Sequence, residues 1–167
     1  IFDITNSQGI LDAVAKVKSE LKKSECIAGL VNNAGVAMGG PVTLIGTEVF
    51  RKQFDINFFG LIDVTKAFLP LLGATKNSYY QGKIINISSV SGKRSYPFMA
   101  PYTASKFAVE AFSDSLRREL MIYGIDVILI EPGPIKTAIW DKTPDPENND
   151  FIGTDYEPSL EQFYKYF

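Results

Sequence analysis

Tyr102 and Lys106 are the two residues of this sequence whose types and spacing most directly suggest chemistry. They stand four positions apart in "APYTASKFAVEAF", residues 100–112, and a four-residue step along a helix brings two side chains onto one face. A phenol ordinarily titrates near pH 10, and a cation beside it favours the phenolate and lowers its pKa. A tyrosine in that setting can give a proton to a carbonyl or take one from an alcohol.

A second pair with the same spacing, Tyr79 and Lys83, lacks this context. It straddles the dipeptide "QG" just before a predicted strand, where a four-residue step does not bring side chains together. We therefore interpret Tyr79 and Lys83 as surface residues. For Tyr102 and Lys106, ordinary helix packing stays the alternative at this point.

The composition excludes several kinds of site. The chain carries a net charge of -2 and no basic block longer than two residues, which argues against a nucleic-acid surface. It has one cysteine, Cys26, and no histidine. An internal disulfide, a zinc-type ligand set and serine-histidine or cysteine-histidine catalysis are therefore excluded, and we expect no bound metal.

The length and apolar content place the chain among globular proteins. A hydrophobic content of 46% in 167 residues is enough to bury a core, and the length predicts one domain. No apolar run approaches the roughly 18 residues of a membrane-spanning helix, and nothing resembles a signal peptide. The expected location is the cytoplasm.

Apolar patterning predicts alternating helices and strands. Apolar residues recur from Ile10 to Leu21 at steps of four, three and four, which is typical of one helical face, whereas "IAGLV" and "IDVILIE" are unbroken apolar runs typical of buried strands. Thr47 is the predicted cap of a long helix, and Gly124 is predicted to end another. The predicted strands are 1–4, 27–31, 83–88 and 125–131, and the predicted helices are 7–25, 48–72, 101–123 and 159–167.

This alternation predicts an α/β fold with a parallel sheet covered by helices on both faces. Ligands bind such sheets at the carboxyl ends of the strands. Polar and small residues follow the predicted strands directly, and they are Asp3, Asn32 to Gly35, Ser88, Ser89, Pro132 and Gly133. Residues 136–158 are polar and rich in Pro, Asn and Asp, and they are predicted to form a loop.

Five short segments occur together in one order. They are "LVNNAG" at 30–35, "FDINFFG" at 54–60, "GKIINISSVSG" at 82–92, "YTASK" at 102–106 and "EPGPIKT" at 131–137. In this series the chain resembles the short-chain dehydrogenase/reductase family, nicotinamide-dependent oxidoreductases built on a Rossmann-type, doubly wound parallel sheet. The resemblance covers nearly the whole chain and fades after about Trp140. Residues 111–120 are most similar to members that act on hydroxysteroids, retinol and similar apolar alcohols.

The resemblance implies catalytic roles for four residues. Tyr102 is the expected general acid or base, and Lys106 is expected to lower its pKa and to hold the ribose hydroxyls of the nicotinamide. Ser89, thirteen residues before Tyr102, is chosen over Ser88 and is expected to stabilise charge on the substrate oxygen. Asn57 is expected to hold a water that relays protons from Lys106 toward solvent.

The resemblance also implies NAD or NADP as the cofactor. Besides Tyr102 and Lys106, the residues implied are Asp3 for the adenine, Asn33, Ala34 and Gly35 for the adenosine half, Pro132 and Gly133 for the nicotinamide, and Ile135 and Thr137 for its carboxamide and the phosphates. The small residues of the first loop permit close approach of the backbone.

The family's glycine-rich phosphate loop, "TGxxxGxG", is not in this chain. Its expected place is about two βα units before Asp3, so we interpret the chain as a partial domain that lacks the N-terminal βαβα portion. Backbone amides of that loop hold the pyrophosphate, and without them we expect weak dinucleotide binding and little activity from this chain alone. The residue that selects NAD or NADP lies in the same portion, so both cofactors stay open.

We expect one partial domain over residues 1–167, in which residues 136–167 form a substrate-covering loop and short helix. The expected substrate is a small molecule, an apolar primary or secondary alcohol or its carbonyl. Aromatic residues available to cover it, or simply to pack, are Trp140, Phe151, Tyr156, Phe163, Tyr164 and Phe167.

Members of the family associate through the helices that correspond to 48–72 and 102–123, which implies a homodimer or homotetramer; core packing is the alternative reading of these helices. Two alternatives to an enzyme stay open, namely a truncated inactive product and a non-catalytic dinucleotide-binding or scaffold protein. The intact set of Asn57, Ser89, Tyr102 and Lys106 favours the enzyme.

Overall fold

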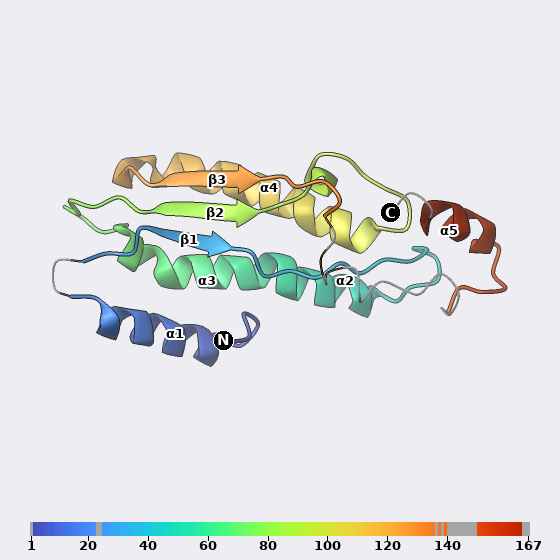
Figure 1. The fold of residues 1–167 in the computed structure, drawn as a ribbon, viewed down its shortest axis with the longest axis horizontal. Helices are drawn as coiled ribbons and strands as arrows, with labels where there is room; N and C mark the ends of the chain where they lie inside the picture. Colours follow the sequence, from blue (N-terminus) through green and yellow to red (C-terminus); the bar gives the residue numbers. More distant parts are fainter. Residues whose placement is uncertain (1, 23–24, 136, 138, 140–149, 165–167) are drawn as a thin grey trace.

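Three parallel strands form the sheet in the computed structural model of this protein, which describes residues 2–22, 25–135, 137, 139 and 150–164 (Figure 1). The strands are β1 (Gly29–Asn32), β2 (Lys83–Ile87) and β3 (Asp126–Ile130), in the order β1-β2-β3. The strands predicted at 27–31, 83–88 and 125–131 are therefore formed, shifted by at most two residues at either end. All three strands run the same way, so their carboxyl ends meet at one edge.

The strand predicted at 1–4 is wrong for the described residues. Residues 4 and 5 form a turn, in which the backbone N–H and the hydroxyl of Thr5 both donate to Asp3 Oδ1 at 2.8 Å. These local bonds satisfy polar groups that a strand would present to a neighbouring strand. The next residue, Asn6, accepts from the backbone N–H of Gly9 and begins α1 (Ser7–Glu20).

Helices α1, α3 (Leu61–Phe68) and α4 (Ala100–Leu120) pack on one face of the sheet. Right-handed connections between successive parallel strands place their helices on the same side. Leu72, Ile84, Leu116 and Val127 are at the centre of the core beneath α4. Fully burying an aliphatic side chain of this size contributes about 1.5–3 kcal/mol, so this cluster holds α4 against β2 and β3.

The opposite face of the sheet is also apolar. Val31, Ile128 and Ile130 point to it and are 57%, 38% and 46% exposed. Ile85 is paired with both Val31 and Ile128, and Ile87 is paired with Ile130. Among the described residues, every helix that packs on the sheet lies on the first face. Helices were predicted on both faces of the sheet, and the described residues place them on one face.

The helix predicted at 48–72 is one continuous helical run with a change of pitch in its middle. It consists of α2 (Thr47–Phe54), a π-helical segment (Asp55–Gly60), α3 and a final 3₁₀ turn (Leu69–Leu72). Gly46, rather than the predicted Thr47, is the N-cap, and it makes no side-chain capping bond. π-Helical segments within α-helices are often found at functional sites, and this one contains Asn57.

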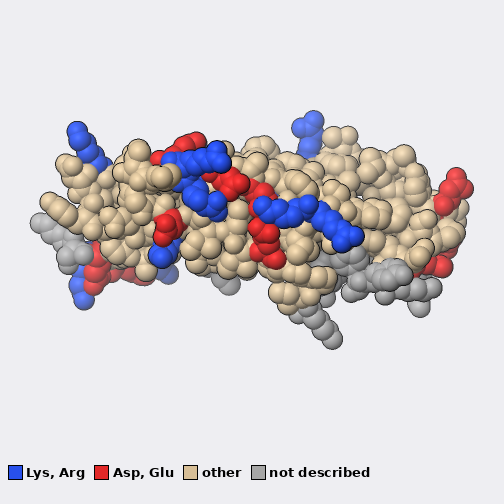
Figure 2. Space-filling model, turned by 90° about the horizontal axis from the view of Figure 1, so that it is seen from above, with Lys and Arg blue, Asp and Glu red and all other residues tan. Residues whose placement is uncertain are grey.

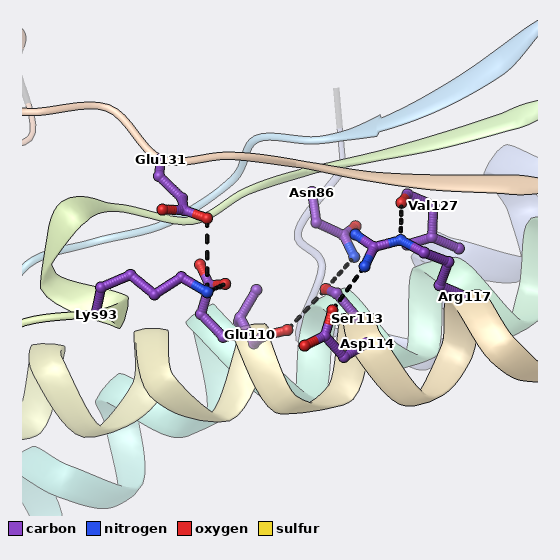
Figure 3. Close-up of polar contacts among 9 residues, drawn as sticks. Asn86, Lys93, Glu110, Ser113, Asp114, Arg117, Val127 and Glu131 are labelled. Carbon is purple, nitrogen blue, oxygen red and sulfur yellow. Dashed lines mark hydrogen bonds and ion pairs between the residues drawn. The ribbon is translucent and has the colours of Figure 1, made fainter.

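Buried polar side chains join the sheet to the helices through the core. Asn32 Nδ2 donates to Thr65 Oγ1 at 2.9 Å and to Asn86 Oδ1 at 2.8 Å. Asn86 Nδ2 in turn donates to Ser113 Oγ at 2.8 Å (Figure 3). This chain of bonds, the asparagine ladder, connects β1, β2, α3 and α4.

α4 is the longest described helix and begins and ends much as predicted. Pro101 lies in its first turn, where a missing N–H costs no hydrogen bond. The run ends in a 3₁₀ turn and Gly124, whose φ of +68° suits glycine. None of the helices in the described ranges combines the length and the apolar character that crossing a bilayer requires.

Candidate active site

A cavity of about 590 Å³ lies beyond the carboxyl ends of the three strands. Residues that directly follow β1, β2 and β3 contribute to it, as the fold predicts. Its lining consists of Asn33, Gly35, Ile87, Ser88, Ser89, Val90, Ser91, Arg94, Tyr96, Tyr102, Lys106, Pro132, Gly133, Pro134, Ile135, Thr137, Ile139 and Phe163. Three of the four predicted catalytic residues, Ser89, Tyr102 and Lys106, are thus brought together.

Ser89 is placed by the turn that follows β2. It is the N-cap of a 3₁₀ turn (Val90–Gly92), and its Oγ accepts from the backbone N–H of Ser91 at 3.1 Å. The side chain is 8% exposed. The hydroxyl hydrogen is left to point toward another acceptor, because Oγ uses only its lone pairs in the capping bond.

Tyr102 lies in the first turn of α4 with its ring packed against Ala37 and Met99. It is 6% exposed, and this burial raises the pKa of the phenol, while a hydrogen bond with Ser89 opposes that rise. The expected lowering of the Tyr102 pKa by Lys106 is therefore not found: burial is the dominant effect, and Ser89 is the residue that opposes it. The neutral phenol is the form that this site favours.

Lys106 lies one helical turn after Tyr102, with its side chain along the same face of α4. Its Nζ donates to the carbonyl oxygen of Ile87 at 2.8 Å and is 5.7 Å from the centroid of the Tyr102 ring. Burial lowers the pKa of Lys106 from 10.5 to about 8, and the nearby charge of Glu110 partly opposes this. An ammonium with one protein acceptor has two further N–H groups for a ligand in the cavity.

Asn57 does not line the cavity but holds the loop that does. Its Oδ1 accepts from the N–H of Val36 at 2.9 Å, and its Nδ2 donates to the carbonyl of Val36 at 2.9 Å and to Ser105 Oγ at 3.2 Å. Gln53, one turn earlier and fully buried, donates to the same carbonyl and accepts from the N–H of Met38. We call Gln53 and Asn57 the amide clamp.

The amide clamp shows a residue that sequence reasoning missed. Gln53 stands four positions before Asn57, so the two share a helical face. This pair of amides on one helical face is the feature of the sequence that could have indicated Gln53. The role of Asn57 in holding a water stays a prediction.

Replacing Gln53 by leucine tests the clamp. The volume is nearly kept, but the half-buried N–H of Met38 loses its acceptor and the Val36 carbonyl loses one of its two donors, so we expect a loss of about 2 kcal/mol in the free energy of unfolding. Urea denaturation measures this loss. Gln162→Leu on exposed α5 (Glu157–Tyr164) is the control and should change little; equal stability of the Gln53→Leu protein and the parent would contradict the clamp.

The residues expected at the cofactor divide into two groups. Asn33, Gly35, Pro132, Gly133, Ile135 and Thr137 line the cavity, whereas Ala34 is beside it in the same loop. A Cβ at Gly35 would come 3.3 Å from Asn57 Oδ1 and 4.0 Å from Lys106 Nζ. A larger residue there would reduce the space beside the lysine.

Asp3 does not lie at the cavity. It is an exposed turn residue, and hydrogen bonds from the N–H and hydroxyl of Thr5 lower the pKa of its carboxyl. The prediction that Asp3 ends a strand is therefore wrong, since that strand is not formed; its contact with adenine stays a prediction.

The lining fits a ligand rich in hydrogen-bonding groups. Ser88 Oγ is buried at the cavity wall and has no hydrogen-bond partner within the described residues. A buried hydroxyl without a partner is costly, so a bound polar group that reaches it would be stabilised. Together with Lys106 Nζ and the small loop residues, this is a donor set suited to the sugar and amide groups of a nicotinamide dinucleotide.

The aromatic residues predicted over the substrate are only partly at the cavity. Phe163, on α5, lines it and meets Phe98 edge to face, with ring centroids 5.8 Å apart. Phe151 is buried, and the hydroxyl of Tyr156 accepts from Thr43 Oγ1 at 2.9 Å. Trp140, Phe167 and the side chain of Tyr164 lie outside the described residues.

An ion-pair cluster joins Glu110 of α4 to Lys93 and Glu131 (Figure 3). Lys93 Nζ is 2.8 Å from Glu110 Oε2 and 3.7 Å from Glu131 Oε1, and the Glu110 side chain is only 7% exposed. Lys93 follows the turn that carries Ser89, Glu110 is one turn after Lys106, and Glu131 precedes Pro132. The cluster therefore ties together the three segments that form the cavity.

The surrounding surface carries both signs of charge. Figure 2 shows Lys and Arg side chains interspersed with Asp and Glu along the middle of one face, without an extended patch of either sign. Pairs such as Arg117 with Asp114, at 2.7 Å, contribute to this pattern (Figure 3). Exposed pairs of this kind contribute little to stability.

The chain is similar to known oxidoreductases in both sequence and structure. A family model described as short chain dehydrogenase matches residues 1–148. An NADPH-dependent 3-dehydrocapnine reductase of Ornithobacterium rhinotracheale is 45% identical over 99% of this chain and 58% of its own length. Human retinol dehydrogenase 16 is 39% identical over 96% of this chain and 54% of its own length.

Solved structures agree with this similarity. A 3-oxoacyl-[acyl-carrier protein] reductase from Brucella melitensis in complex with NAD matches with a TM-score of 0.74 and 28% identity, over 84% of this chain and 55% of that one. A short chain dehydrogenase from Burkholderia cenocepacia in complex with NADP matches with a TM-score of 0.71 and 32% identity, over 86% and 56%. The chain thus spans about half the length of the curated relatives it matches.

Proposed function

Because this chain belongs to the short-chain dehydrogenase family, we propose that its cavity serves hydride transfer between a nicotinamide cofactor and the carbon of an alcohol or carbonyl. One observation carries the proposal: Ser89, Tyr102 and Lys106 converge on one cavity at the carboxyl ends of the strands. The chain shares its Rossmann-type fold with the solved relatives. Ligands bind such folds at the carboxyl ends of the strands, where this cavity lies.

Each of the three residues has a chemical task in this proposal. The Tyr102 hydroxyl donates a proton to the oxygen of a carbonyl substrate during reduction, or accepts one from an alcohol during oxidation. Ser89 donates a hydrogen bond to the same oxygen and stabilises the charge that develops there. Lys106, whose Nζ lies 5.7 Å from the Tyr102 ring centroid, offers N–H groups that hold the cofactor beside the Tyr102 hydroxyl.

The cofactor, when bound, supplies or accepts the hydride, and the protein supplies placement and the proton. We expect Lys106 and Ser88 to hold hydroxyl and amide groups of the nicotinamide half, with Asn33, Gly35 and Pro132 forming the wall beside it. Relatives in complex with NADP and with NAD support a nicotinamide dinucleotide of either kind.

An apolar substrate is supported by the cavity wall and by the relatives. Tyr96, Ile139 and Phe163 pack beside Tyr102 and form an apolar side of the cavity. Proteins named retinol dehydrogenase and 3-ketodihydrosphingosine reductase are among the relatives. We propose an alcohol or ketone that carries a sizeable hydrocarbon part.

Self-association through the two long helices belongs to the same proposal. Phe59, in the π-helical segment, is 51% exposed, and Phe107, on α4, is 43% exposed. Burying aromatic rings such as these is a favourable term in association. Sedimentation of the parent and of Phe107→Ser tests the proposed homo-oligomer, which the substitution should weaken.

A label-transfer assay tests the catalytic proposal even if turnover is slow. The protein is incubated with a reduced nicotinamide cofactor carrying deuterium at the transferring position, together with aliphatic, steroid and retinoid carbonyl compounds. We expect mass spectrometry to find deuterium on the carbinol carbon of at least one product. A Tyr102→Phe protein should give none above background. If the parent transfers no label to any of these classes, the proposed activity is contradicted.

A further inference from the structure

Arg94 lines the cavity but has no part in the proton or hydride steps. It follows the turn that carries Ser89, and its backbone N–H donates to the carbonyl of Val90 at 3.0 Å. Its guanidinium carbon lies 5.5 Å from the centroid of the Tyr96 ring. Stacking on an aromatic ring restrains a long side chain and leaves the edges of the guanidinium for other partners.

Positive charge predominates in the described lining around Arg94. Among the described residues of the cavity lining, Arg94 and Lys106 carry positive charge and none is an aspartate or glutamate. The ion pairs found in the described ranges do not include Arg94, whereas its neighbour Lys93 is held by Glu110. A cavity with two cations and no carboxylate favours an anionic ligand.

The surroundings of Arg94 also restrict the shape of that ligand. Tyr96, on which the guanidinium lies, belongs with Ile139 and Phe163 to the apolar residues that pack against Tyr102. A ligand that reaches Tyr102 along this wall would therefore present hydrocarbon to the wall and could place a charged end at Arg94. Planar guanidinium groups bind carboxylate and other oxyanions with two parallel hydrogen bonds.

We propose that Arg94 binds an acidic head group of the substrate, so that the enzyme acts on amphiphilic alcohols or ketones with a hydrocarbon body and an anionic end. This inference rests on the proposed function, because it assigns the substrate class of the same cavity. It adds a specificity-determining residue, Arg94, that contacts the substrate away from the reacting carbon.

Binding of three ligands of equal chain length tests the proposal without requiring turnover. Octanoate, octanesulfonate and octanol are titrated by NMR into the parent protein, Arg94→Gln and Arg94→Lys. Because hydrogen bonds to charged groups are stronger than those between neutral groups, we expect Arg94→Gln to weaken binding of the two anions by about 10-fold or more and to leave octanol binding unchanged. Arg94→Lys should keep part of the affinity, since it keeps the charge but not the planar fork.

Arg118→Gln is the matched control, because it removes the same charge from an exposed position of α4. If Arg118→Gln weakens anion binding as much as Arg94→Gln does, the effect is one of net charge and the proposal is overturned. The proposal is also overturned if Arg94→Gln binds all three ligands as tightly as the parent does. It is overturned as well if Arg94→Gln weakens the binding of NADPH but not of octanoate, because that result would assign Arg94 to the cofactor.

A turnover arm separates this inference from the proposed function. The ratio of kcat/KM for oxooctanoate to that for its methyl ester is expected to fall about 10-fold in Arg94→Gln. An unchanged ratio with active enzyme overturns the role of Arg94 alone. If no variant transfers hydride but anion binding still depends on Arg94, the proposed activity is overturned and the anion site at Arg94 is supported.

Discussion

A Tyr102→Phe protein is expected to keep its fold and to lose about a thousandfold or more of its turnover. The substitution removes the one hydroxyl that the proposed reaction uses as general acid or base, a role that contributes about 10²–10⁴-fold. The ring and its packing against Ala37 and Met99 remain. The free energy of unfolding should change by no more than about 1 kcal/mol, the worth of a single hydrogen bond such as that with Ser89.

Steady-state kinetics and urea denaturation of the same preparations measure the two effects. Tyr79→Phe is the control, because Tyr79 has the same spacing to a lysine in sequence but is 101% exposed. It should match the parent in both measurements. If Tyr102→Phe retained more than about a tenth of the parent turnover, its role as proton donor would be refuted.

A Lys106→Met protein is expected to be inactive and yet more stable than the parent at pH 7. The pKa of Lys106 is about 8 in the folded protein, against 10.5 ordinarily. Below pH 8 the amine is protonated in both states, so the folded state bears the full cost of a buried charge, about 3 kcal/mol. Methionine removes that cost but leaves the carbonyl of Ile87 without its donor, at about 1 kcal/mol, and the net gain is about 2 kcal/mol.

The pH dependence gives this prediction a sign that can be checked. Between pH 8 and 10.5 the unfolded parent holds a proton that the folded parent has released, so the parent gains stability as pH rises through this window. The advantage of Lys106→Met should therefore shrink from pH 8 upward and turn by about pH 10.5 into a disadvantage of up to about 1 kcal/mol, which is the cost of the Ile87 carbonyl without its donor. Urea denaturation at pH 7 and pH 10.5 measures it, with exposed Lys18→Met as control. A mutant less stable than the parent at pH 7 would contradict the buried-charge account.

Most of the fold could be predicted because local patterning and tertiary packing agree. The unbroken apolar runs became β1, β2 and β3, and the periodic run after Asn6 became α1. The predicted strand before Asp3 failed because a strand is stabilised by a neighbour, and the described residues offer local side-chain bonds in its place. The apolar pattern did not indicate the change of pitch in the long helix; the π-helical segment contains Asn57, whose hydrogen bonds reach a loop distant in sequence.

The candidate site was predictable where one motif supplies both spacing and chemistry. Ser89, Tyr102 and Lys106 follow a strand or lie one turn apart on a helix, and the fold brings them to one cavity. Gln53, Arg94 and Glu110 were missed because their roles come from partners in other segments: a loop carbonyl, an aromatic ring and Lys93 respectively. The pKa of Tyr102 was misjudged because charge was considered and burial was not.

The asparagine ladder has a consequence for strand pairing. Paired strands that are apolar on both faces tolerate a shift in register, because one aliphatic side chain replaces another with little loss of burial. A short strand such as β1 also has few backbone hydrogen bonds to oppose such a shift. Asn32 and Asn86 are paired across β1 and β2, and each finds its partner only in the observed register. A slip of β1 by one residue would turn Asn32 to the other face and take its amide away from Thr65 and Asn86, which stay buried. The ladder thus selects one alignment of the sheet and one rotation of α4, and with them the distance from Ser89 to Tyr102.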